Sequence, residues 1–126
     1  MTRIATIVIL ASLCLGGCSS TETETPQQAL QAIIDLYEAR DFDLLIRTRY
    51  AEIDKADGEN QIQQLVDRFA KRFASDTSLR EAVNTYRKAL KIQPVLSEKG
   101  TIATFRLETG FIKLSLQKNE TWGFHL

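Results

Sequence analysis

An α+β domain is predicted from a change in the hydrophobic period near Pro94. Before this proline, apolar residues recur every three or four positions, as in amphipathic helices. After it they alternate with polar residues, as in half-buried strands. This order predicts N-terminal helices packed on one face of a C-terminal antiparallel meander of three to four strands. The chain of 126 residues is long enough for one such domain, which we place at 25–126.

Four helices are expected before the proline. The first begins at a capping box formed by Thr25 and Gln28, with Pro26 at the first helical position. The second is capped by Asp41 or Asp43. The third spans about 60–74 and the fourth about 77–91, with Ser78 and Glu81 expected to form a capping box. Helical spacing assigns these residues to the buried sides: Leu30, Ile33, Ile34, Tyr37, Phe42, Leu45, Ile46, Tyr50, Ile62, Leu65, Val66, Phe69, Ala70, Phe73, Leu79, Ala82, Val83, Tyr86 and Leu90.

Strands are expected after the proline. The segment "PVLS" reads as a short strand, and "TIATFRL", "FIKLSLQ" and "TWGFHL" alternate apolar and polar residues. Turn residues separate them at 98–100, 109–110 and 118–120. The alternation predicts one apolar sheet face made of Ala103, Phe105, Leu107, Ile112, Leu114, Leu116, Trp122, Phe124 and Leu126.

Three segments together resemble small bacterial lipoproteins of the cystatin-like, nuclear-transport-factor-2-like superfamily. They are the capped helix that runs through "ARDFD" into a second helix, the final meander, and the closing "KNETWGFHL". The resemblance covers 25–126 and implies a cystatin-like fold. It also implies that enzymes of this kind use an Asp, Tyr or His in a cone-shaped pocket between sheet and helices. The chain departs from the pattern in its two long helices before the strands and in Thr121, where a glycine is usual.

The N-terminal segment predicts secretion. "MTR" is a short positive start, and the 14 uncharged residues that follow are too few to span a bilayer comfortably. "LGGC" at 15–18 resembles the lipobox of bacterial lipoprotein signal peptides. That resemblance implies a diacylglycerol on the Cys18 thiol, cleavage before Cys18 and acylation of the new amine. Cys14 is a poorer candidate because bulky Leu13 precedes it. A plain secretion signal with a chance cysteine, or an uncleaved anchor, is the alternative.

The expected organisation is therefore a signal peptide at 1–17, a lipidated cysteine and flexible tether at 18–24, and the domain. The polar tether reaches at most ~23 Å. Ser19 follows the cysteine, and by resemblance to Gram-negative lipoproteins the absence of Asp there favours the inner leaflet of the outer membrane, facing the periplasm. The sequence leaves a Gram-negative or Gram-positive source open. The mature domain has no free thiol, so no disulfide is expected.

No constellation of residues predicts catalysis. His125 is the only histidine, so no metal site is expected, and no "GxSxG" context accompanies it. It alternates opposite to Trp122 and Phe124, which predicts a position at solvent or a sheet edge. Three tyrosines fall on apolar helical faces and could line a pocket; the alternative is that they are core residues with hydroxyls at the rim. They are Tyr37, Tyr50 and Tyr86.

Charge is divided unevenly along the chain although 16 basic residues balance 16 acidic ones. Residues 19–60 hold ten acids and four bases, whereas 61–126 hold six acids and eleven bases. The balance gives no indication of nucleic-acid binding. A basic face on the third and fourth helices is expected to meet lipid headgroups, anionic glycan or an acidic partner, or else to be an ordinary solvated face. Its candidates are Arg68, Lys71, Arg72 and Arg87, with Arg80, Lys88 and Lys91 nearby.

These patterns predict a membrane-anchored envelope lipoprotein with a non-enzymatic binding domain. Its expected partners are the membrane, through the lipid, and an envelope protein, a peptidoglycan-related polymer or a small apolar ligand. No cofactor is expected besides the covalent lipid on Cys18. The alternatives are a pocket enzyme of the ketosteroid-isomerase type and a structural subunit of an envelope complex.

Overall fold

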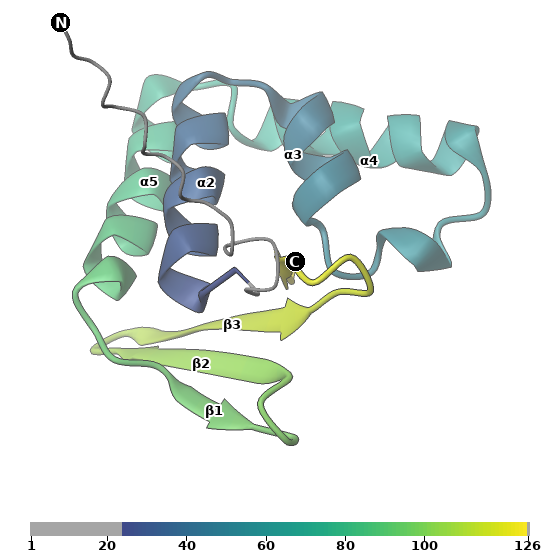
Figure 1. Ribbon diagram of the computed structural model, residues 1–126. Helices are drawn as coiled ribbons and strands as arrows, with labels where there is room; N and C mark the ends of the chain where they lie inside the picture. Colours follow the sequence, from purple (N-terminus) through teal and green to yellow (C-terminus); the bar gives the residue numbers. More distant parts are fainter. Residues whose placement is uncertain (1–23, 126) are drawn as a thin grey trace, which may run out of the picture.

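The computed structural model describes residues 24–125 and confirms the predicted α+β arrangement (Figure 1). Four α-helices come first and a four-stranded antiparallel sheet follows in the order β1-β2-β3-β4. The elements are α2 (Pro26–Glu38), α3 (Phe42–Arg49), the short 3₁₀ helix η3 (Ile53–Lys55), α4 (Glu59–Arg72), α5 (Asp76–Leu90), β1 (Val95–Ser97), β2 (Ile102–Leu107), β3 (Gly110–Leu116) and β4 (Trp122–Phe124). The expected signal peptide, Cys18 and Leu126, which was predicted on the apolar sheet face, lie outside the described residues.

Two helix starts follow the sequence prediction. The Thr25 hydroxyl accepts a hydrogen bond from the Gln28 amide (3.1 Å), and the Gln28 side chain accepts one from the Thr25 amide (2.9 Å). This is the expected capping box of α2. Of the two candidate caps for α3, Asp41 is the one used, because its carboxylate accepts from the Leu44 amide (3.2 Å).

Two local predictions were wrong. Helix α5 is capped by Ser75, whose hydroxyl accepts from the Ser78 amide (3.1 Å), so Ser78 and Glu81 form no capping box. The reason is that an N-cap needs an acceptor three residues before a free amide, and Ser75 meets that need first. Tyr50 does not belong to the buried side of α3, because this helix ends at Arg49. Tyr50 adopts an extended backbone and forms a parallel bridge with Phe124.

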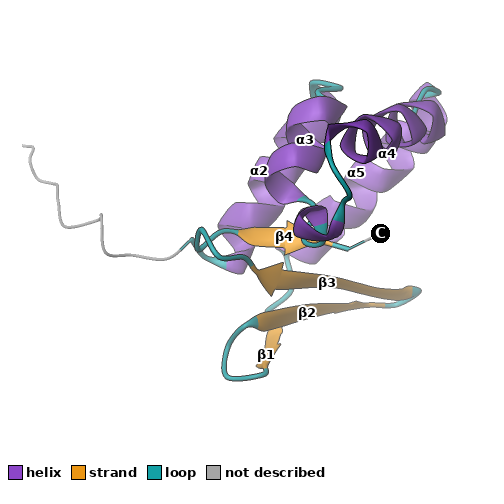
Figure 2. Ribbon diagram, turned by 90° about the vertical axis from the view of Figure 1, so that its right-hand side faces the viewer, coloured by secondary structure: helices purple, strands orange, loops and turns teal. Residues whose placement is uncertain are grey.

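The helices cover one face of the sheet (Figure 2). Helix α2 packs against α5, and α3 packs against α4; α2, α3 and α5 also contact strands. The strand register places alternate side chains on the covered face, and the fully buried ones include Ala103, Phe105 and Leu114. The opposite face of β1 to β3 carries no helix in the described part of the chain.

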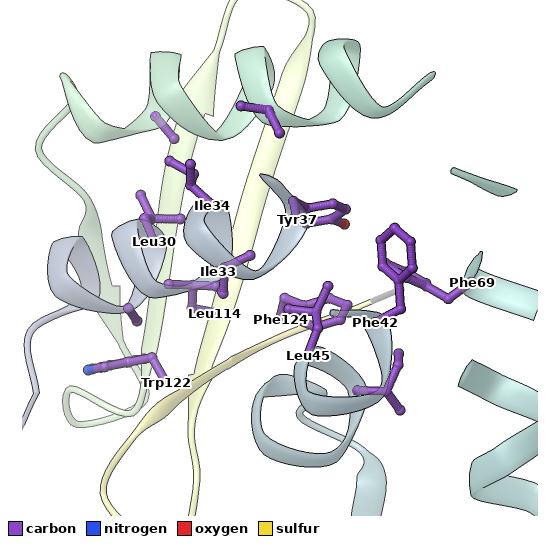
Figure 3. Close-up of a cluster of buried hydrophobic side chains, with 14 of the residues drawn as sticks. Leu30, Ile33, Ile34, Tyr37, Phe42, Leu45, Phe69, Leu114, Trp122 and Phe124 are labelled. Atoms are coloured by element: carbon purple, nitrogen blue, oxygen red, sulfur yellow. The ribbon is translucent and has the colours of Figure 1, made fainter. Parts of the chain in front are cut away.

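The interior is filled by aliphatic and aromatic side chains that form one cluster (Figure 3). Leu30, Ile33 and Ile34 of α2 are buried over Leu114 of the sheet. Within the cluster, aromatic rings from α2, α3, α4 and its C-cap, α5 and β4 contact one another, with centroids between 4.8 and 6.4 Å apart. This aromatic cluster comprises Tyr37, Phe42, Phe69, Phe73, Tyr86 and Phe124.

A glycine allows the end of α3 to pass closely over β4. A Cβ at Gly123 would lie 2.9 Å from the Ala51 Cα and 2.9 Å from the Arg49 carbonyl oxygen. The Ala51 amide donates to the Phe124 carbonyl (2.9 Å), which continues the pairing beyond β4. The free side of β4 is thus closed by the segment that follows α3.

None of the helices in the described range 24–125 is both long and apolar enough to cross a membrane.

Candidate functional site

The three candidate tyrosines do not line one pocket. Tyr37 is buried, and its ring centroid lies 5.5 Å from that of half-buried Tyr86. The two hydroxyls share a hydrogen bond, and burial raises the pKa of both, to about 12 for Tyr86. Tyr50 lies elsewhere, with its ring 5.8 Å from that of Phe124. The sequence placed all three on apolar helical faces, and the structure brings only Tyr37 and Tyr86 together.

One open groove lies beside Tyr86, where the end of α4, the first half of α5 and β3 meet. It holds about 380 Å³ and is lined by Arg72, Phe73, Ser78, Glu81, Ala82, Thr85, Tyr86 and Ile112. Arg72 lies over the Phe73 ring, 5.4 Å from the ring centroid, a contact worth about 0.5–1 kcal/mol at an exposed site. The groove combines apolar walls with a guanidinium and short polar side chains, which is a composition suited to binding.

A second open groove lies on the same helix, nearer its start. It holds about 290 Å³ between α4 and the chain around η3, and is lined by Tyr50, Glu52, Lys55, Ala56, Gln61, Gln64, Leu65 and Arg68. Arg68 and Arg72 are one helical turn apart on α4, so they border neighbouring grooves. We call the two hollows together the α4 grooves.

The basic candidates do not form one continuous face. Arg87 of α5 forms an ion pair with Glu38 of α2, and so is partly neutralised within the domain. Lys71 is exposed on α4, one residue from Arg72. Within 24–125 neither Arg68 nor Arg72 forms an ion pair. Among the described residues, Arg68 and Arg72 therefore keep unpaired guanidinium groups at the α4 grooves, which also contain Lys55, Glu52 and Glu81, whereas Arg87 contributes to holding α5 on α2.

A polar cluster surrounds His125, just after β4. The Ser115 hydroxyl lies 2.7 Å from His125 Nε2, and Glu52 Oε2 lies 4.0 Å from His125 Nδ1. Burial, followed by the charge of Lys113, lowers the pKa of His125, although Glu52 acts in the opposite direction. The imidazole is therefore neutral at neutral pH and shares one hydrogen bond with Ser115. His125 is partly buried rather than fully at solvent, because Ser115 and Glu52 cover two of its edges.

This cluster places a hydroxyl, an imidazole and a carboxylate side by side in space, but it lacks the geometry of a nucleophilic triad. The 4.0 Å separation is too long for the hydrogen bond that fixes the imidazole in such sites. Glu52 also lies 3.5 Å from the Tyr50 hydroxyl and 3.7 Å from Lys55, so its charge is shared. Within 24–125, no group of three or more histidine, cysteine or acidic residues is arranged to hold a metal ion.

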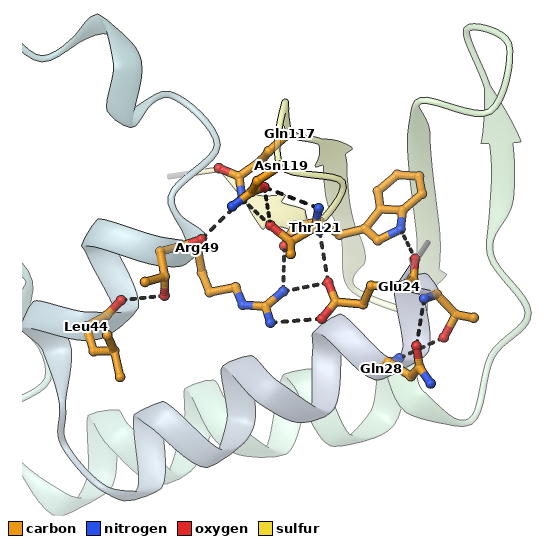
Figure 4. A network of polar contacts seen from close by, with 10 residues as sticks. Glu24, Gln28, Leu44, Arg49, Gln117, Asn119 and Thr121 are labelled. Carbon is orange, nitrogen blue, oxygen red and sulfur yellow. Dashed lines mark hydrogen bonds and ion pairs between the residues drawn. The ribbon is translucent and has the colours of Figure 1, made fainter. Parts of the chain in front are cut away.

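Glu24 makes the most extensive polar contacts near the start of the described chain (Figure 4). Its carboxylate accepts two hydrogen bonds from the Arg49 guanidinium (2.6 and 2.8 Å) and one from the Trp122 amide (3.0 Å). The Trp122 indole donates to the Glu24 carbonyl (2.8 Å). Burial raises the pKa of the Glu24 carboxyl, but hydrogen bonds from Arg49 and Trp122 outweigh that effect and hold the pKa below its ordinary value.

We call this set of contacts the Glu24 clasp. It joins the chain before α2, the end of α3 and β4, which are up to 98 residues apart. The β3–β4 turn is held beside the clasp, because the side-chain amide of Gln117 donates hydrogen bonds to the Thr48 carbonyl (3.2 Å) and to the Thr121 hydroxyl (3.0 Å). The sequence assigned Glu24 to the tether from composition alone and gave no signal for these contacts. The clasp fixes where the preceding chain enters the fold, at the β4 side of the sheet.

The sequence and the structure were compared with those of known proteins. A scan against family models, a search of curated proteins and a search of solved structures each found no match.

Proposed function

We propose that this protein is a lipid-anchored component of the bacterial cell envelope whose folded domain binds an acidic segment of another envelope protein in the α4 grooves. The lipobox-like "LGGC" supports the anchor, with Cys18 as the acylated residue. The binding role rests on one observation: Arg68 and Arg72 border neighbouring grooves without an ion-pair partner among the described residues.

The chemistry of the grooves favours an acidic peptide with apolar side chains. Arg68 and Arg72 offer planar donors for carboxylates, which they bind in a bidentate manner. Leu65 in one groove, and Tyr86 with Ile112 in the other, offer apolar surface for the neighbouring side chains. Both hollows are open rather than enclosed, which suits an extended segment better than a small ligand.

An enzyme of the ketosteroid-isomerase type has less support. Such an enzyme needs an enclosed cavity in which a tyrosine hydroxyl and an acid converge. Tyr86 and Glu81 border the same groove, but that groove is open to solvent and the Tyr86 hydroxyl is engaged with Tyr37.

The anchor is tested by the mass of the mature protein and by Cys18→Ala. We expect a mass that includes acyl chains and begins at Cys18, and we expect Cys18→Ala to leave the membrane fraction. A mature mass without acyl chains contradicts the anchor, as does membrane retention of Cys18→Ala.

The binding role is tested by photo-crosslinking in intact cells from a reactive residue at Gln64, which lines one groove. We expect a discrete adduct that the double variant R68E/R72E abolishes. Lys91→Glu is the matched control, because Lys91 is an exposed base at the end of α5, outside the α4 grooves. An adduct that persists in R68E/R72E, or is lost equally in Lys91→Glu, contradicts the proposal.

A further inference from the structure

The sheet has a second surface, which the helices leave uncovered (Figure 2). Directly paired residues point to the same side of an antiparallel sheet. The register aligns Val95 with Thr104 and Lys113, and Arg106 with Phe111. We call these five residues, with Ile102 and Ser115 beside them, the outer sheet face.

Large apolar side chains are exposed on this surface. Phe111 is 64% exposed and Val95 is 59% exposed. They are two of the four exposed large hydrophobic residues in the described chain; the others are Leu44 on α3 and Leu96, which pairs with Ala103 and so points to the opposite side of the sheet. Phe111 and Val95 flank Thr104 and Arg106 at one end of the sheet. Apolar side chains gathered on an uncovered face indicate a contact surface.

The strands of this surface carry basic side chains and no acidic ones. Arg106 and Lys113 are exposed on it, and the adjoining turns add exposed Lys99, Glu98 and Glu108. Strands β1, β2 and β3 contain no Asp or Glu, and none of the three bases forms an ion pair within 24–125. The strand residues of the face therefore carry two positive charges and no negative one, with the acids confined to the turns at its ends. Exposed apolar residues surrounded by bases are complementary to an anionic lipid surface.

The Glu24 clasp fixes where the proposed tether enters the fold. Glu24 is bound to Trp122 of β4, so the chain enters the fold at one side of the sheet. Residues 18–24 extend at most ~23 Å, which keeps the sheet near the acylated cysteine of the proposed anchor.

We propose that the outer sheet face lies on the membrane, with Arg106 and Lys113 at anionic phospholipid headgroups and with Phe111 and Val95 at the interface. This inference rests on the proposed acylation of Cys18. It places the sheet next to the bilayer and the helix layer, with the α4 grooves, on the side away from it.

The test uses the acylated full-length mature protein in vesicles, with a polarity-sensitive dye on a single introduced cysteine. Thr104→Cys reports on the centre of the outer sheet face, and Asn84→Cys, exposed on α5, is the matched control in the helix layer. The vesicles are phosphatidylethanolamine with or without phosphatidylglycerol. We expect a blue shift and quenching by spin-labelled lipid at position 104 in the vesicles with phosphatidylglycerol, reversed by high salt, and neither effect at position 84.

The double variant R106E/K113E, made in Thr104→Cys, sharpens the test. Each base near an anionic surface contributes a roughly fivefold change in binding, so this variant is expected to weaken docking about 25-fold or more. An acylated protein without a shift at position 104, or with equal shifts at both positions, overturns the docking and leaves the anchor intact. A shift that R106E/K113E does not reduce also overturns it. A protein that carries no acyl chain overturns the anchor and the docking together.

Discussion

The two sides of this one sheet differ in what surrounds them. At the β4 side, Trp122, Gly123 and Phe124 are buried, the chain after α3 pairs with Phe124, and the Glu24 clasp ties in the N-terminal chain. At the β1 side, Val95, Leu96 and Ser97 are all exposed and pair with β2 alone among the described strands. The β4 side therefore holds the fold together, whereas the β1 side and the outer sheet face are available for contacts outside the domain.

The largest loss of stability is expected from Phe124→Ala at the β4 side. Phe124 is fully buried, and its ring lies 5.8 Å from those of Tyr50 and Phe69. Truncation leaves a cavity and is expected to lower the free energy of unfolding by about 4 kcal/mol. Urea unfolding followed by the fluorescence of Trp122, the single tryptophan, measures the change. A loss below about 1 kcal/mol would mean that the β4 side is not the core described here.

A smaller loss is expected from Gly123→Ala. The new Cβ would meet two backbone atoms of the chain after α3 at 2.9 Å, and backbone cannot move aside as a side chain does. We expect the free energy of unfolding to fall by about 3 kcal/mol. Gly110→Ala is the control, because a Cβ there meets nothing within 4 Å. Equal effects of the two variants would contradict the close approach at Gly123.

Glu24→Gln tests the Glu24 clasp. We expect it to lower the free energy of unfolding by about 2 kcal/mol, because hydrogen bonds to a charged group are removed. Glu38→Gln, which removes an exposed ion pair with Arg87, is expected to cost under about 1 kcal/mol. The two variants are compared by urea unfolding at neutral pH.

The clasp also predicts a dependence on pH. The folded pKa of Glu24 lies below its ordinary value of 4.5, so its contribution is fully present above that value. It is lost as the pH falls below 4.5 through the folded pKa. Unfolding measured from pH 6 downward is therefore expected to show a stability difference between Glu24→Gln and the unchanged protein that shrinks below about pH 4.5. A difference that persists at the lowest pH at which the protein folds would contradict an ionised Glu24 in the clasp.

The smallest effect on stability is expected on the other side of the sheet. Phe111→Ser changes an exposed residue and is expected to alter the free energy of unfolding by less than about 0.5 kcal/mol. The same variant is expected to reduce the docking of the acylated protein on vesicles with phosphatidylglycerol. A large loss of stability would show that Phe111 packs within the domain and is not a contact residue.

The difference between the two sides also explains which features could be predicted from the sequence. The helices and strands followed from hydrophobic period, and local rules found the Thr25–Gln28 box and the Asp41 cap. The alternation in "FIKLSL" puts Phe111 opposite to Ile112 and Leu114, so the sequence held a signal for the exposed apolar face that our prediction did not use.

Contacts between distant segments had no such signal. Glu24 and Trp122 are 98 residues apart, and a carboxylate in a polar run looks the same in sequence whether solvated or buried. Likewise, helical period placed Tyr37, Tyr50 and Tyr86 on apolar faces, but only the packing of α2 against α5 decides which rings meet. The pairing of Arg87 with Glu38 depends on the same packing.

Hydrogen–deuterium exchange of the acylated protein tests the two-sided account most directly, by comparing vesicles that contain phosphatidylglycerol with detergent micelles. We expect the vesicles to slow amide exchange in β1 and the adjoining 95–113 region, and to leave α4 and the already slow β4 unchanged. Slower exchange in α4 with no change at β1 would contradict the account, because it would place the helix layer and its grooves against the membrane.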